Sequence, residues 1–209
     1  MKYTHLISTA ALVMALIPGT GCLRQRERTP ISKQKLNGSG KVYLVPLGAF
    51  SDATVKHLAS YYRDKYGLQV EALAHVVLPP ESMNPGRQQL IAEVAVEIMK
   101  QAYPELSNDP QAILIGLAKE DMYIAQKNWR FSFSWREQGK YAVVSTGRMH
   151  LPLAMQPLSK DQIRTRLRKM VTKNVGVLYY DLAQSDDPRS VLYRNVGGVE
   201  ELDYMGEEF

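Results

Sequence analysis

The residues best suited to hold a metal or to move a proton are few and scattered in this sequence. Histidine is a common zinc ligand and a general base near neutral pH, and the chain has four, namely His5, His57, His75 and His150. We expect each of them in a different part of the fold, as a surface or half-buried side chain. No cluster of histidines is therefore predicted.

The amphipathic segment 159–180 predicts a long helix, and it carries neither a histidine nor an acid pair spaced to hold a metal. We therefore expect this protein not to be a working zinc hydrolase, because a catalytic zinc needs several protein ligands to activate its water. The alternative is a relocated site in which His150 joins Asp181, Asp186 or Asp187, since carboxylates can replace imidazole.

A serine nucleophile would need Ser145 or Ser190 beside a histidine and an acid. Ser145 is close to His150 in sequence, but no G-x-S-x-G elbow surrounds it. A turn role for this serine is the simpler interpretation. The sequence also contains no P-loop and no dinucleotide fingerprint, so nucleotide cofactors are not predicted.

The elements that must position these residues follow from hydrophobic periodicity. Apolar runs and turn residues predict strands at 41–46, 69–74, 112–117, 130–135 and 141–145, and helices after Ser51, around 90–101 and at 159–180. The last two strands form a hairpin, and the continuous run 112–117 is typical of a strand buried on both faces. This order predicts an α/β (α+β) domain over 41–209, with a mixed sheet of about five strands, two packed helices and a long helix in the C-terminal half.

The helix faces are predicted from the same spacing. We expect the second helix to bury Leu90, Ile91, Val94 and Ile98 and to be broken by Pro104. Ser159 and Gln162 form a capping box at the start of the last helix. Its predicted apolar stripe is Ile163, Leu167, Met170, Val171, Val175 and Leu178, and Arg164, Arg168 and Lys169 are predicted on its other faces.

The first 40 residues are a leader and a tether. Residues 1–21 have the anatomy of a bacterial signal peptide, with Lys2 before an apolar stretch that is too short to span a bilayer. Cys22 follows small residues as in the lipidated cysteine of bacterial lipoproteins, although Gly19 replaces the usual leucine. We expect residues 22–40 to tether an exported, periplasmic protein to a bacterial membrane. Simple cleavage near Cys22, or an uncleaved anchor, is the alternative.

The charge distribution argues against a nucleic-acid partner. The formal net charge is +5, but residues 1–40 hold six of the 26 basic residues and one of the 21 acidic ones, so residues 41–209 are neutral overall. No aromatic residue is interleaved with the basic tether for base stacking. Its basic residues suit attraction to anionic head groups or plain solvation.

Several fragments, in order, resemble the archaemetzincins, a family of small metzincin-like zinc peptidases. They are Pro46-Leu47-Gly48, Arg87 at the expected start of the second helix, Ile115-Gly116-Leu117, Glu120-Asp121-Met122-Tyr123, Phe131-Ser132-Phe133, and Val143-Val144-Ser145 before Arg148. The resemblance covers 41–209. It implies a metzincin-like fold with a zinc site on the long helix.

The catalytic signature of that family, HExxHxxGxxHC, is degenerate here. The resemblance places Lys173, Val177 and Ala183 where zinc-binding histidines stand and Asn174 where the catalytic glutamate stands, and Tyr180 also departs from the signature. Asn cannot accept a proton at neutral pH, and Lys brings positive charge to a site for a dication. We expect no metal and no cofactor, with zinc required only by a relocated site.

A cleft beside the helix is the remaining expectation. Its candidate residues are Arg130, Phe131, Phe133, Trp135 and Tyr180. The plain interpretation of the aromatic strand is sheet core, and the functional one is a cleft edge where a metzincin-like fold binds an extended peptide.

Segment 186–203 is expected either to pack through Val191, Leu192 and Leu202 or to close over the site. The sequence thus predicts an inactive, lipid-tethered pseudo-peptidase that binds a peptide or protein, against two alternatives: a divergent hydrolase and a purely structural envelope protein.

Overall fold

The computed structural model describes residues 36, 38–137, 139–153 and 157–209. The predicted signal peptide, Cys22 and most of the predicted tether lie outside these residues. Its strands are β1 Lys41–Pro46, β2 Val70–Ala72, β3 Met83–Asn84, β4 Gln89–Ile91, β5 Ala112–Ala118, β6 Met122–Tyr123, β7 Ser134–Glu137 and β8 Tyr141–Ser145. Its helices are α1 Asp52–Tyr66, α2 Ala92–Ala102, α3 Pro104–Asn108, α4 Lys160–Leu178 and α5 Val199–Tyr204, and Pro80–Ser82 forms a 3-10 turn.

The main sheet has the strand order β2-β1-β5-β8-β7. The first four strands run parallel, and β7 is antiparallel to β8 at the edge. Every residue of β5 is buried, as expected of the central strand. The predicted α/β class and mixed five-stranded sheet are confirmed.

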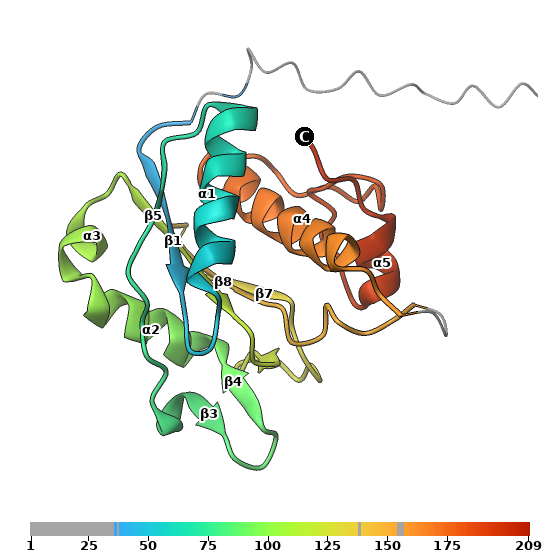
Figure 1. The fold of residues 1–209 in the computed structure, drawn as a ribbon, viewed down its shortest axis with the longest axis horizontal. Coiled ribbons are helices and arrows are strands. Elements are labelled where there is room, and N and C mark those ends of the chain that lie inside the picture. The colour runs from blue at the N-terminus through green and yellow to red at the C-terminus, as the bar shows by residue number, and fades with distance from the viewer. Residues whose placement is uncertain (1–35, 37, 138, 154–156) are drawn as a thin grey trace, which may run out of the picture.

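Two layers of helices cover this sheet (Figure 1). Helices α1 and α4 pack on one face around a core that includes Leu44, Ile115 and Val171, and α5 joins this core through Leu202. Helix α2 covers the other face around Val45, Leu114 and Met99. Helix α4 therefore lies across the sheet close to β7 and β8.

The start of the second helix differs from the prediction. Leu90 and Ile91 belong to β4, which pairs with β3 and with β6 in a second, three-stranded sheet, and Arg87 lies in the turn before β4. Helix α2 buries Ala92, Ala95, Val96 and Met99, while Val94 and Ile98 are only half-buried. The reason is that apolar residues occupy nearly every position here, so periodicity alone could not choose the buried face, and pairing with β6 did.

The aromatic strand is shorter than predicted. β7 begins at Ser134, because the preceding residues are held elsewhere: the Ser132 amide donates to the Met122 carbonyl at 2.7 Å. The Ser132 hydroxyl also donates to the Ser134 carbonyl at 2.7 Å. Segment 130–133 thus precedes the edge strand, although its Phe133 carbonyl already accepts a hydrogen bond from the Ser145 amide of β8 at 2.9 Å.

Helix α4 has the predicted cap but buries more polar residues than predicted. The capping box of Ser159 and Gln162 is present, and Leu167 and Val171 face the core. Lys169 was predicted on an outer face but is only 7% exposed. Its Nζ donates to the carbonyls of Leu202 at 3.0 Å and Asp203 at 2.7 Å, near the end of α5. A buried cation here is stabilised by carbonyl groups that a helix end leaves unpaired.

Candidate functional site

A cleft of about 710 Å³ lies between the edge of the main sheet and α4. Four of the five expected cleft residues line it: Arg130, Phe131, Phe133 and Trp135. The fifth, Tyr180, lies elsewhere and packs edge-on against Tyr179 and Phe209. The other lining residues are Ile124, Asn128, Trp129, Ser132, Ser134, Arg136, Met170, Lys173, Gln184, Arg194, Asn195, Val196 and Gly197.

The segment after α4 packs against the domain and also borders the cleft. Val191, Leu192 and Leu202 are buried and anchor it to the domain. Residues 194–197 of the same segment form part of the cleft wall. Anchoring at both ends of this short stretch holds the wall in place.

The edge strand β7 faces the floor of the cleft with polar side chains. Its residues pair with β8 through the register Ser134↔Val144 and Arg136↔Ala142, and β7 is the last strand of the sheet. Ser134 and Arg136 both hydrogen-bond to Asn174 of α4. The side chains of strand and helix are therefore locked together at this point.

Asn174 is fully buried and uses both ends of its amide group. Its Nδ2 donates to the Ser134 hydroxyl at 2.9 Å and to the Met170 carbonyl at 2.7 Å. Its Oδ1 accepts from the Arg136 guanidinium at 3.1 Å. The resemblance places a general base at this position, but here a neutral amide holds structure together and has no free acceptor aimed at a water molecule.

Lys173 stands beside it on the cleft wall, only 4% exposed. Its ammonium group donates to the Tyr193 carbonyl. Burial, and to a smaller extent the positive charge of Arg136, lowers the pKa of Lys173 to about 8. A side chain that remains largely cationic at neutral pH is a poor ligand for a dication.

The donor set does not fit a zinc ion. Val177 is half-buried and Ala183 is exposed, and neither side chain carries a donor atom. In the part of the chain that the structure describes, no group of three or more His, Cys, Asp or Glu side chains is placed to hold a metal.

The other candidates for chemistry are scattered. His57, His75 and His150 are exposed, and Asp186 pairs with Arg194 at 2.9 Å. The Ser145 hydroxyl donates to the Glu120 carbonyl at 2.5 Å and accepts from the Gly147 amide at 3.1 Å, which is the turn role predicted for it. The Ser190 hydroxyl accepts from the Leu192 amide at 3.2 Å within its own turn.

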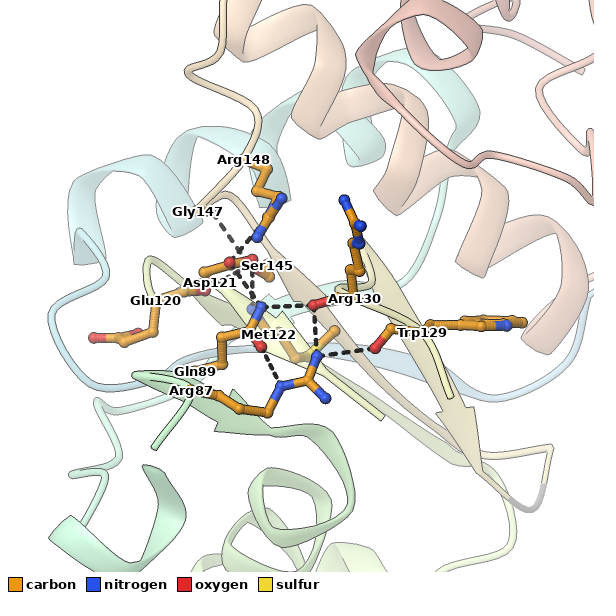
Figure 2. A network of polar contacts seen from close by, with 10 residues as sticks. All are labelled: Arg87, Gln89, Glu120, Asp121, Met122, Trp129, Arg130, Ser145, Gly147 and Arg148. Carbon is orange, nitrogen blue, oxygen red and sulfur yellow. Dashed lines mark hydrogen bonds and ion pairs between the residues drawn. The ribbon is translucent and has the colours of Figure 1, made fainter. Parts of the chain in front are cut away.

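A polar network supports the aromatic wall of the cleft from behind (Figure 2). Arg87 donates to the carbonyls of Trp129 at 2.9 Å and Arg130 at 2.7 Å. Gln89 Nε2 bridges the Arg130 carbonyl at 3.0 Å and the Asp121 carboxylate at 2.8 Å. These contacts fix the backbone of segment 129–131 against β4 and β6.

The same network extends to the end of β8. Arg148 donates to Asp121 at 2.9 Å, and its guanidinium lies 4.3 Å from the centre of the Phe131 ring. Gly147 approaches so closely that a Cβ atom there would lie 2.4 Å from the Asp121 amide nitrogen. Several fragments that carry the family resemblance, around Arg87, Asp121, Phe131 and Arg148, therefore meet in one network, a role that their separate positions in sequence did not reveal.

The comparisons with known proteins agree with this architecture. No protein-family model matches the sequence, and no curated protein matches it. The archaemetzincin of Archaeoglobus fulgidus, determined with malonate, matches with 22% identity and a TM-score of 0.63 over 81% of this chain and 94% of that one. The archaemetzincin of Methanopyrus kandleri matches with 20% identity and a TM-score of 0.62 over 87% and 92%.

A third solved structure, a zinc-dependent peptidase from Methanocorpusculum labreanum, has 16% identity and a TM-score of 0.64 over 80% of this chain and 95% of that one. In all three cases the match covers more than nine-tenths of the solved chain. The chain therefore has the archaemetzincin-like fold that its sequence fragments predicted. The positions at which the resemblance places zinc-binding histidines carry Lys173, Val177 and Ala183.

Proposed function

We propose that this protein is a catalytically inactive archaemetzincin-like protein whose cleft binds an extended segment of a peptide or protein. The observation that carries the proposal is that Asn174, at the position of the family's general base, is a buried neutral amide. It is hydrogen-bonded to Ser134, Arg136 and Met170. A general base needs a free acceptor in reach of its proton. This arrangement instead favours a rigid binding surface.

Peptide binding is supported by the edge strand and its aromatic approach. An edge strand offers unpaired backbone groups to which an extended chain can add as a further strand. Trp129 is 55% exposed and Phe131 is half-buried beside β7, so apolar side chains of a ligand have rings to pack against. The polar network behind segment 129–131 keeps these rings in place before a ligand arrives, which reduces the entropy lost on binding.

Purified protein is expected to contain less than about 0.1 zinc per chain and to leave a mixed peptide library uncleaved, since it lacks the ligand set of a catalytic zinc site. Metal content by mass spectrometry and cleavage by peptide sequencing check this on tag-free protein. One zinc per chain, or cleavage that a chelator stops, favours the runner-up, a divergent hydrolase with a relocated site. His150→Ala is then the matched variant, because a site built on His150 with Asp181, Asp186 or Asp187 would lose its zinc.

We also propose export and attachment to a bacterial membrane through Cys22, which rests on residues outside the described part of the chain. None of the described helices is long and apolar enough to cross a membrane. Cells that express the full chain are expected to incorporate labelled palmitate into it, and Cys22→Ser is expected to abolish the label. Unlabelled wild-type protein in the periplasmic fraction would show simple cleavage instead of lipidation.

A further inference from the structure

All the charged side chains that line the cleft are cations. Its charged lining residues are Arg130, Arg136, Lys173 and Arg194, and no aspartate or glutamate is among the described residues that line it. This local excess contrasts with residues 41–209, which hold equal numbers of basic and acidic residues. The cleft therefore has a local excess of positive charge in a domain that is neutral overall.

The four cations differ in whether a carboxylate neutralises their positive charge. Arg194 pairs with Asp186 at 2.9 Å. Arg130 is exposed, and in Figure 2 its side chain points away from Arg87 and Gln89, so it is available at the mouth of the cleft. The remaining two, Arg136 and Lys173, lie deeper.

Arg136 and Lys173 are bonded only to neutral acceptors among the described residues. The Arg136 guanidinium donates to the Asn174 amide oxygen at 3.1 Å, and the Lys173 ammonium donates to the Tyr193 carbonyl. Burial lowers the pKa of Arg136, and burial together with Arg136 lowers that of Lys173. Two partly desolvated like charges with no counter-charge raise the energy of the empty cleft, and an anion would lower it.

We infer that the cleft selects a peptide segment that carries a carboxylate, which Arg136 and Lys173 hold together while Trp129 and Phe131 pack against the neighbouring residues. This inference rests on the proposed peptide-binding function and names its ligand class. A guanidinium can bind a carboxylate through two parallel hydrogen bonds, and a lysine adds a point charge. Arg130 at the mouth would draw an acidic segment toward the cleft.

The chain provides its own reporter for this binding. Its only two tryptophans, Trp129 and Trp135, both line the cleft, so intrinsic fluorescence at pH 7 reports on occupancy. Three probes separate the sources of the carboxylate: an acetylated and amidated peptide with two glutamates, its glutamine counterpart, and that counterpart with a free C-terminal carboxylate. Of the two carboxylate peptides, the one that binds more tightly shows whether a side chain or a chain terminus is preferred.

The preferred carboxylate peptide is expected to bind at least about tenfold more tightly than the amidated glutamine peptide, with an affinity that falls as salt is raised from 50 to 300 mM. Arg136→Gln is expected to remove this preference, and Arg136→Lys to keep part of it, because the charge remains but the two parallel hydrogen bonds are lost. Arg164→Gln, an exposed arginine elsewhere on α4, is the matched control and is expected to leave binding unchanged. Circular dichroism of each variant verifies that it is folded.

The outcomes separate this inference from the function on which it rests. Equal affinity for the carboxylate and glutamine peptides, or a preference that survives Arg136→Gln in folded protein, overturns the carboxylate inference and leaves the peptide-binding cleft intact. Failure of all three peptides to bind at millimolar concentration, by fluorescence and by calorimetry, overturns both.

Discussion

Asp203→Ala is expected to lower the free energy of unfolding by about 3–5 kcal/mol, because it leaves a buried guanidinium without its counter-charge. Arg166 of α4 is 1% exposed, and it forms a two-pronged ion pair with Asp203 of α5 at 2.7 and 2.6 Å. Its remaining nitrogen donates to the carbonyls of Met149 at 2.6 Å and Leu151 at 2.7 Å. One arginine thus ties α4 to α5 and to the segment after β8.

Urea denaturation of the wild-type protein and the variant measures this loss. Asp203→Asn keeps the size of the side chain and one acceptor oxygen, so an intermediate loss is expected from it. Arg164→Gln is the control, because its pair with Asp161 is exposed and such pairs contribute little, within about 0.5 kcal/mol. A loss below about 1 kcal/mol for Asp203→Ala would mean that water reaches the guanidinium when its partner is removed.

Lys173→Met is expected to stabilise the protein at pH 7, by about 1–2 kcal/mol. The pKa of Lys173 falls from the ordinary 10.5 to about 8 on folding, and each pKa unit corresponds to about 1.4 kcal/mol against the charged form. Methionine removes this cost of up to about 3 kcal/mol, and it also removes the hydrogen bond to the Tyr193 carbonyl, which offsets about 1 kcal/mol or more of the gain. If Lys173 binds a ligand as proposed, this cost to the fold is an exchange of stability for function, which is common in proteins.

The pH dependence of this difference has a definite sign. Between about pH 8 and 10.5 the unfolded chain keeps the Lys173 proton that the folded chain has released, so the wild-type stability gains with rising pH from this group. The advantage of Lys173→Met should therefore shrink between pH 7 and pH 10, as urea titrations at both values would show. An advantage that stays constant would mean that Lys173 is well solvated in the folded state. Lys160→Met, at the exposed start of α4, is the control and is expected to change stability at pH 7 by less than about 0.5 kcal/mol.

Much of the architecture could be predicted because its signals are local. The serine cap and the glycine at the end of α1, the capping box of α4 and the fully apolar run of β5 are all formed by residues close in sequence. The small sheet of β3, β4 and β6 was missed because two- and three-residue strands carry almost no periodicity. Its existence depends on Leu90 meeting Met122 across the fold.

The candidate site likewise has features that the sequence determines and features that depend on the tertiary structure. That the long helix lacks the side chains of a zinc peptidase is a matter of residue identity, so the sequence by itself determined it at Lys173, Asn174 and Val177. Only the tertiary structure decided that Asn174 is fully buried, that Lys173 faces a cationic cleft and that Arg166 is neutralised by Asp203. The physical reason is that burial and charge compensation depend on groups brought together from distant parts of the chain, and a pattern of neighbours in sequence does not specify which of them meet.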